Sequence, residues 1–223
     1  MIALTLSTLF ALGLAACTKE TPAQLPAGPQ LVSEAAAAMR AVNSAHVTID
    51  TEGQVGSLPL KSAEGDLTRS GDAKGTIKLV ALSALLEVEF VVVGPDYYIK
   101  GLSGGWQKQT AADVATFYDP SAILDPDRGV AKILSTATNA TTEATETVNG
   151  VDTYRVAVTF DSSAVATVVP GVPVGITGLL WLDQASKRLV KAVLTVPAAT
   201  GEPGKVTIGL SNYDVPVTIS APV

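Results

Sequence analysis

The sequence predicts an α+β protein in which helices gather on one face of a curved antiparallel sheet. Apolar and polar residues alternate with a period of two from Ala45 to Lys100 and again from Thr147 onward, which is the pattern of half-buried strands. Gly, Pro, Asn and Asp separate these runs at intervals suited to turns. Helical spacing is confined to one stretch before the first strand and to an insertion between the two groups of strands. Because no repeat or second boundary interrupts the pattern, we expect one domain over residues 31–223.

The first sixteen residues form an uncharged, apolar segment that ends at Leu14-Ala15-Ala16-Cys17. A helix needs about 20 apolar residues to cross a bilayer, so this run predicts a secretory signal over residues 1–16 rather than a membrane span. Cys17, the single cysteine of the chain, follows the small-residue cleavage site and is the predicted acceptor of a bacterial lipid anchor. Signals usually start with Lys or Arg, and neither precedes this run, so we expect the natural start to lie upstream of Met1.

A tether and a helix are expected next. Residues 17–30 contain three prolines and no periodicity, which predicts a lipidated N-terminus and a flexible, partly extended tether. Residues 31–42 are rich in alanine and place their larger apolar side chains at helical spacing, which predicts an amphipathic helix that ends at Asn43-Ser44. The anchor and the tether would hold the domain at the outer, periplasmic face of the cell membrane.

Residues 45–100 predict an antiparallel meander with one apolar face. Turns are expected at residues 53–57, at Gly71-Asp72 and at Gly94-Pro95-Asp96. The central strands alternate aliphatic with polar residues, so their apolar side chains should point the same way. The predicted strand face consists of Ile77, Leu79, Leu86, Val88, Phe90 and Val92.

Residues 111–134 interrupt the strands. A short helix is expected at residues 113–118, and another after Asp125, a candidate N-cap, and Pro126, which suits a first helical turn. The apolar residues of this insertion would face the sheet; they are Ile123, Leu124, Val130, Ile133 and Leu134. Residues 136–147 are rich in threonine and alanine and predict either a loop or an exposed strand.

The C-terminal part returns to strands. Asn149-Gly150 is the strongest short-range hairpin signal in the chain. Asp161 is suited to cap a short helix over residues 162–169. Residues 168–175, with two prolines and two glycines, predict a loop that would form a rim or lid. Further strands are expected at residues 176–183, 188–196, 206–210 and 215–219.

Charge and cysteine content exclude several function classes. The net charge of −6 argues against nucleic acid as a partner, because phosphate binding needs clustered Lys and Arg. It also argues against adsorption to anionic lipid by charge alone. A single cysteine cannot form an internal disulfide, and lipidation would leave no free thiol for chemistry.

Candidate catalytic patterns have simpler explanations. Residues 101–105 match G-x-S-x-G around Ser103, but a hydrolase elbow needs a following helix and a later histidine. The only histidine, His46, precedes the motif, so a glycine-rich hairpin turn is the better interpretation. A single histidine does not make a zinc site, and Asp119, Asp125 and Asp127 lack the spacing of a calcium loop. We therefore expect no enzyme activity, no metal and no cofactor.

Apolar surface is what remains. Hydrophobic residues make up 47% of the chain and aromatic residues only 5%, so aliphatic side chains dominate. If the predicted strand face and the insertion meet, they form a filled core; if the sheet curves away, they line a cavity for acyl chains. The residues alone leave both possibilities open.

The sequence resembles one family of mycobacterial cell-envelope lipoproteins, the LppX/LprA/LprF/LprG family, and its LprG branch in particular. The most specific match is Tyr118-Asp119-Pro120 followed by Asp125-Pro126-Asp127. Weaker matches, which extend the resemblance over nearly the whole domain, are residues 44–46, 65–67, 89–92, 148–150 and 215–222.

The resemblance implies a half-barrel of antiparallel strands with helices on its concave face and a hydrophobic cavity between them. The implied ligands are acylated lipids or glycolipids such as phosphatidylinositol mannosides, lipoglycans or triacylglycerol, carried across the envelope. Release would require a partner membrane or a membrane lipid exporter. The alternatives are a structural or adhesive lipoprotein with a filled core and no ligand, and an esterase that uses Ser103.

Overall fold

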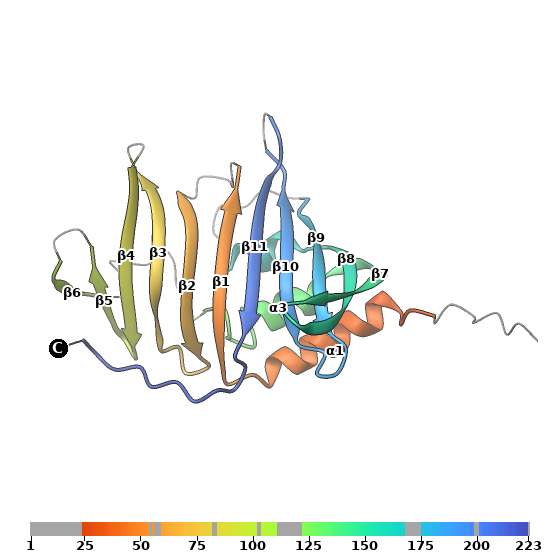
Figure 1. Ribbon diagram of the computed structural model, residues 1–223, viewed down its shortest axis with the longest axis horizontal. Coiled ribbons are helices and arrows are strands. Elements are labelled where there is room, and N and C mark those ends of the chain that lie inside the picture. The colour runs from red at the N-terminus through yellow and green to blue at the C-terminus, as the bar shows by residue number, and fades with distance from the viewer. Residues whose placement is uncertain are drawn as a thin grey trace, which may run out of the picture.

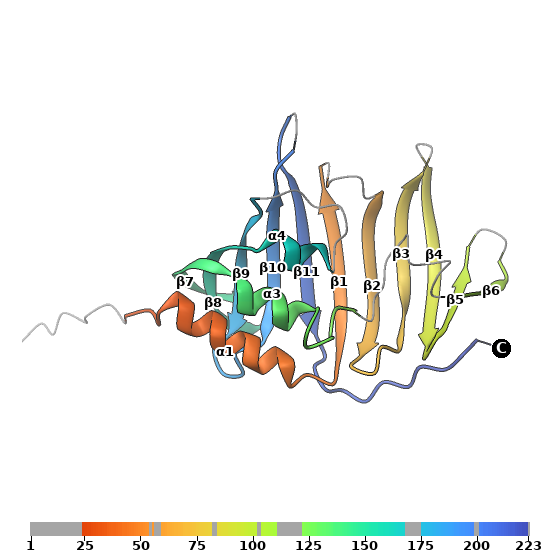
Figure 2. The same cartoon turned by 180° about the vertical axis from the view of Figure 1, so that it is seen from behind.

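A single antiparallel sheet of eleven strands organises the protein, as seen in a computed structural model (Figure 1). The structure describes residues 24–53, 55, 59–81, 84–101, 104–110, 122–167, 175–198 and 201–222. The strand order is β6-β5-β4-β3-β2-β1-β11-β10-β9-β8-β7, so the sheet is open, with β6 and β7 at its two edges. All the described helices lie on the same face of the sheet (Figure 2). The predicted α+β class is therefore confirmed.

The described elements, in chain order, have the following bounds. The helices are α1 (Gly28–Arg40), α3 (Val130–Thr136) and α4 (Ser162–Ala166). The strands before α3 are β1 (Ser44–Glu52), β2 (Leu60–Thr68), β3 (Ala73–Ala81), β4 (Ala84–Val93), β5 (Asp96–Lys100) and β6 (Trp106–Thr110). Those after it are β7 (Thr138–Val148), β8 (Val151–Thr159), β9 (Thr177–Asp183), β10 (Leu189–Val196) and β11 (Gly204–Ser211).

Two meanders meet in the middle of the sheet. Strands β1 to β6 pair in sequence order, and so do β7 to β11. The two groups join where β11 pairs with β1, with Val47 opposite Leu210 and Ile49 opposite Ile208. This pair closes the longest sequence separation in the sheet.

Helix α1 begins earlier than its periodicity predicts. It starts at Gly28 rather than Leu31, so the last three residues of the predicted tether form its first turn, where Pro29 needs no hydrogen-bond partner for its nitrogen. The side of the helix that carries Leu31, Ala35 and Met39 is buried. At the other end, the Arg69 side chain donates to the backbone carbonyls of Arg40 and Val42, which satisfies acceptors that the helix leaves free.

The predicted second helix of the insertion starts at a different residue. Asp125 does not cap it; its side chain accepts the backbone N–H groups of Asp127 and Arg128 and closes a turn. Helix α3 begins only after Gly129, where a Cβ would collide with the carbonyls of Ala122 and Ile123. The helix expected at residues 113–118 lies outside the described residues.

The expected C-terminal strand at residues 215–219 is wrong. Asn212 and Asp214 have positive φ angles of 50° and 58°, so the chain turns out of the ladder after β11. The following segment runs in extended form past the ends of the strands (Figure 1), held by Ser44 Oγ donating to the carbonyl of Val215 and Lys74 Nζ donating to that of Thr218.

Other local predictions are confirmed. Most of residues 136–147 form the exposed strand β7 (Thr138–Val148), one of the two options left open. Asn149 and Gly150 form the hairpin turn between β7 and β8 with φ angles of 51° and 82°. Asp161 caps α4 by accepting the Ala164 backbone N–H at 2.9 Å. Helix α4 ends at Ala166, before the predicted limit at residue 169.

Candidate functional site

The predicted strand face is a single surface of the sheet. In the β3–β4 ladder, Ile77 lies opposite Val88 and Leu79 lies opposite Leu86. Phe90 and Val92 continue the same side of β4, because side chains alternate along a strand. The ladders place Val47 and Ile49 of β1 on this side as well, so it is the helix-bearing face of the sheet. The alternation in the sequence therefore identified one continuous apolar surface.

This inner face is covered unevenly. Near the helices its side chains are fully buried, among them Val156, Leu180 and Leu194. On β3 and β4 the corresponding side chains are only partly buried, although Val92 is 2% exposed. The partly buried residues of the predicted strand face are Ile77, Leu79, Leu86, Val88 and Phe90. The inner face thus changes from a filled core beside α1, α3 and α4 to an incompletely covered aliphatic wall.

A small apolar pocket lies where this wall meets the insertion. Ile77 and Phe90 line it from the sheet and Ile123 lines it from the insertion, which brings the two predicted surfaces together. Its volume is about 20 Å³, and almost all of its exposed lining is carbon. The pocket marks the place where the packed core gives way to the open part of the inner face.

The other predicted insertion residues belong to the packed layer. Leu124, Val130 and Leu134 are buried in the main hydrophobic core, and Ile133 packs against it. Helix α3 packs on α1, so these side chains fill the space between helices and sheet. A role for them in holding lipid stays a prediction.

Residues of β1 and β2, which were not among the predicted site residues, complete the pocket. Val47 and Ile49 carried a usable signal, since they alternate with polar residues. Ala63 and Gly65 carried none, because small residues fit either face of a strand. The close approach of β2 and β3 at this point explains their size: a Cβ on Gly65 would lie 2.5 Å from the carbonyl oxygen of Lys74.

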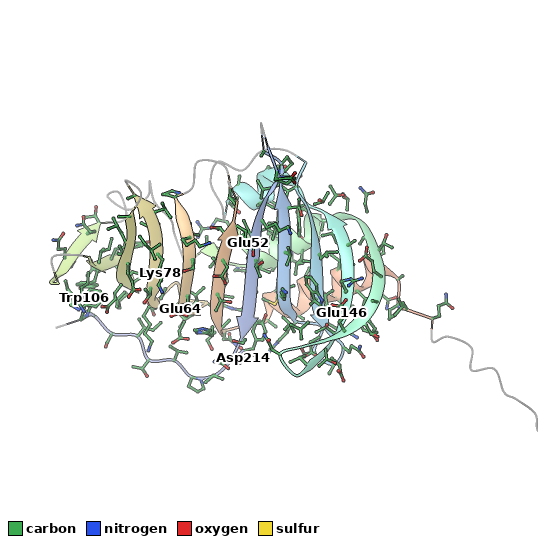
Figure 3. The ribbon with its side chains drawn as sticks, turned by 45° about the horizontal axis from the view of Figure 1, so that its top comes forward. Glu52, Glu64, Lys78, Trp106, Glu146 and Asp214 are labelled. Carbon is green, nitrogen blue, oxygen red and sulfur yellow. The ribbon has the colours of Figure 1, made fainter. Side chains whose placement is uncertain are left out.

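The outer face of the sheet carries the charges. Lys78 Nζ lies 3.4 Å from Glu87 Oε2, and Lys100 Nζ lies 2.8 Å from Glu89 Oε1, each across neighbouring strands. Figure 3 labels Glu64 of β2 and Lys78 of β3. Polar pairs on one face and aliphatic side chains on the other make the β2–β4 region strongly amphipathic.

The residues considered for catalysis do not form a reaction centre within the described part of the chain. His46 Nδ1 lies 2.8 Å from Asp66 Oδ1 across the β1–β2 ladder, on the outer face. The segment around the G-x-S-x-G motif joins two paired strands, β5 and β6, as a hairpin connection does, while Ser103 itself lies outside the described residues. Among the described residues, no group of three or more His, Cys, Asp or Glu side chains is placed to hold a metal ion.

Three expectations concern residues that the structure does not describe. These are the anchor at Cys17, the first half of the tether (residues 17–23), and the rim loop up to residue 174. Within the described ranges, the helices are too short or too polar to cross a bilayer.

Comparison with known proteins places the chain in a family. Residues 27–219 match the LppX_LprAFG lipoprotein family. A protein of Mycobacteroides abscessus named lipoarabinomannan carrier protein LprG is 31% identical over 218 residues, which cover 95% of this chain and 92% of that protein. The protein of the same name from Mycolicibacterium smegmatis is 30% identical over 94% of this chain and 89% of its own length.

Solved structures agree with this assignment. The crystal structure of LprF from Mycobacterium bovis has a TM-score of 0.76 and 26% identity, and the match covers 87% of this chain and 96% of LprF. Mycobacterium tuberculosis LppX has the same fold, with a TM-score of 0.64 at 24% identity over 86% of this chain and 99% of LppX. Because the family match covers residues 27–219 and the curved open sheet agrees with LprF and LppX, the chain belongs to the LppX_LprAFG family of lipoproteins.

Proposed function

We propose that this protein is a membrane-anchored lipid carrier that binds acylated lipids or glycolipids against the inner face of its sheet and carries them across the cell envelope. The ligand classes are those with two or more acyl chains, of the phosphatidylinositol mannoside, lipoglycan or triacylglycerol type. The names of the LprG relatives, which are lipoarabinomannan carriers, support this class. The proposal requires no cofactor and no catalysis.

One observation carries the proposal. The aliphatic side chains of β3 and β4 form a continuous inner face that remains partly exposed, whereas the same face beside the helices is buried. A filled core would bury both halves alike, because each exposed methylene forgoes about 0.8 kcal/mol of hydrophobic stabilisation. An acyl chain laid along this wall recovers that free energy, and the chemistry of the wall matches hydrocarbon.

The polar part of the ligand would stay outside the wall. The inner side chains of β3 and β4 are hydrocarbon, and burying a sugar or phosphate among them without hydrogen bonds would cost several kcal/mol, on the order of 2–7 kcal/mol for each polar group. We therefore place the head group at the mouth, where the predicted rim loop up to residue 175 would lie. Selectivity then depends on the chains more than on the head group.

The predicted anchor fits this role. A carrier of insoluble lipid has to remain near its donor membrane, and acylation of Cys17 would hold the domain there on a short tether. Release of the cargo would need a partner membrane or a membrane lipid exporter, because the proposed binding includes no step that would supply energy for release.

The proposal is tested by placing a bulky side chain in the apolar pocket of the inner face. Ile77→Trp places a bulky ring in the pocket and should reduce the amount of lipid that co-purifies with the protein, measured by native mass spectrometry. Thr207→Trp is the matched control, since residue 207 faces outward on β11 and should leave the lipid content unchanged. Equal lipid in the Ile77→Trp variant and the wild type would mean that the wall does not hold the ligand.

A second measurement separates carriage from a structural role. Delipidated wild-type protein should take up a fluorescent acyl probe, and unlabelled phospholipid should compete for the site. A protein that takes up no probe would support the filled-core alternative of a structural or adhesive lipoprotein.

A further inference from the structure

Two large apolar side chains project from the end of the β3–β4 hairpin. Val80 is 49% exposed and Leu85 is 59% exposed. They lie directly opposite each other in the ladder, on the outer face of the sheet. The other exposed large apolar residues among those described, Leu25 and Val215, lie in separate segments that precede α1 and follow β11. The hairpin end is thus the place where such side chains are paired.

Both faces of the sheet are apolar at this end. One step further from the outer pair, Leu79 lies opposite Leu86 on the inner face, and Ala81 pairs with Ala84 at the end of the ladder. The sequence carries no charge from Leu79 to Leu86. The nearest charges are Lys78 and Glu87, which pair with each other across the two strands on the outer face. Beyond that ion pair the outer face carries Lys74, Thr76 and Glu89, and its apolar residues Val91 and Val93 are only partly exposed. Strongly exposed large apolar side chains on β3 and β4 are therefore confined to the hairpin end.

We propose that this hairpin end, defined as Val80, Ala81, Ala84 and Leu85, is a membrane-contact element whose side chains enter the acyl region of a lipid bilayer. An exposed apolar patch marks a site of interaction with protein or membrane. Protein-binding hot spots are enriched in Trp, Tyr and Arg, none of which occurs here, whereas short aliphatic side chains suit hydrocarbon. Adsorption by charge is excluded as the cause, because the hairpin end is uncharged and the chain is acidic.

The position of the hairpin end adds to this argument. The inner pair Leu79 and Leu86 connects it to Ile77, which lines the apolar pocket, so hydrocarbon side chains run without interruption from the pocket to the hairpin end. The hairpin end is the outermost part of β3 and β4 and lies at the opposite end of the strands from the C-terminal segment (Figure 1). A bilayer at this end would meet the open part of the inner face. Contact with the bilayer does not depend on the proposed cargo, although its use in lipid transfer rests on the proposed function.

The contact is tested by fluorescence quenching on the full-length acylated protein. Leu85→Trp and the control Thr207→Trp are each reconstituted into phosphatidylcholine vesicles with dibrominated acyl chains, and an excess of the same vesicles is added so that either membrane can be contacted. Trp106 and Trp181 contribute the same background to both variants. Emission of the indole introduced at position 85 should fall at least twofold relative to unbrominated vesicles, at low and high salt alike, while the control is unchanged. Equal quenching in the two variants would overturn the proposal.

A charge-pair variant tests the consequence for transfer. Val80→Lys combined with Leu85→Glu repeats the neighbouring Lys78–Glu87 pair, so the hairpin should still fold. The matched control, Val193→Glu with Thr207→Lys, places the same pair across β10 and β11 on the outer face. Transfer of a fluorescent phospholipid between vesicles should fall at least fivefold in the hairpin variant only, with co-purifying lipid unchanged. An unchanged transfer rate would contradict the inference. If wild-type protein carries no lipid but Leu85→Trp is still quenched, the proposed function fails and the membrane contact stands.

Discussion

Residues at the junction of the two meanders hold the start of β1 and the end of β11 together. Asp214 accepts the backbone N–H of Asn43 at 2.8 Å, and its own N–H donates to the carbonyl of Ser44. Arg188 donates to the same carboxylate and lies 5.1 Å from the centre of the Tyr213 ring. The start of β1 and the end of β11 are therefore fixed to each other by side chains as well as by the ladder.

Asp214 makes stability at this junction depend on pH. The hydrogen bond from the Asn43 N–H, with the Arg188 guanidinium beside the carboxylate, lowers the pKa of Asp214 below its ordinary value, despite partial burial. A carboxyl group with a lowered pKa in the folded state stabilises that state above the ordinary pKa of about 4, and this contribution is lost as pH falls through the folded-state pKa.

Asp214→Asn should therefore flatten the fall in the free energy of unfolding below about pH 4. The measurement is urea unfolding of both proteins between pH 7 and pH 3. Asp152→Asn serves as the control, because the Asp152 carboxylate accepts a hydrogen bond from Thr147 and lies away from the junction. A wild-type acid slope in Asp214→Asn would show that the ionised carboxylate does not stabilise the junction.

Tyr213 gives a second test at the same place. Its hydroxyl donates to the carbonyl of Leu189, and burial raises the pKa of Tyr213. Tyr213→Phe removes the donor and should lower the free energy of unfolding by about 1–2 kcal/mol, because a partly buried carbonyl loses its partner. Thermal unfolding measures the loss, and Tyr98→Phe on the outer side of β5 is the comparison. A difference between the two variants of less than a few tenths of a kcal/mol would contradict this role.

At the scale of elements, a pair of glycines sets the approach of β2 and β3. Gly65 lies opposite Gly75 in the ladder, and a side chain on either would collide with the neighbouring backbone. Across the next ladder, Phe90 lies opposite Gly75. We infer that the missing side chains allow the strands to approach closely beside the pocket and leave room for the ring of Phe90.

Gly75→Ala should disturb this approach and lower the free energy of unfolding by about 1–3 kcal/mol, as overpacking does. Gly105→Ala is the matched control, because nothing lies within 4 Å of a Cβ there and its φ is not positive. Urea unfolding of the two variants gives the comparison. A Gly75→Ala variant as stable as Gly105→Ala would show that the strands can move apart without cost.

At the scale of the whole molecule, the helices divide the sheet into a covered half and an incompletely covered half. Helix α1 packs on α3 and reaches β7, so the core lies between the helices and the half of the sheet that contains β7 to β11 and β1. In the half that contains β2 to β5, most inner side chains stay partly exposed, and the buried exceptions Leu67, Ala73 and Val92 lie at one end of the strands. If lipid fills that half, it completes the core, and the folded state should be more stable with lipid than without it.

Removal of lipid should therefore lower the melting temperature. A ligand at about 100 times its Kd stabilises the folded state by about 2.7 kcal/mol, which corresponds to roughly 5–10 °C for a domain of this size. Differential scanning calorimetry before and after extraction, and after phospholipid is added back, measures the shift. Ile77→Trp should show a smaller shift than Thr207→Trp, and equal shifts in these two variants would place the lipid elsewhere.

Local chemistry accounts for what the sequence predicted well. The alternation at Ile77, Leu79 and Leu86 identified the inner face, and Asn149-Gly150 identified a hairpin, because each signal is a property of neighbouring residues. The predicted start of the insertion helix, at Asp125 and Pro126, was wrong. Asp125 has a side chain suited to an N-cap, but it closes a turn instead. Helix α3 starts only at Val130, after Gly129 has passed close to the Ala122 and Ile123 carbonyls.

By itself, the sequence determined the class of the fold, the apolar and polar faces of the strands, and the family. It left core and cavity undecided, because the same aliphatic side chains suit both. Only the tertiary structure decided which part of the inner face the helices cover, that β11 pairs with β1, and that Ile123 rather than Leu134 reaches the strand wall. Those outcomes depend on contacts between residues far apart in the chain, and periodicity within a strand carries no information about them.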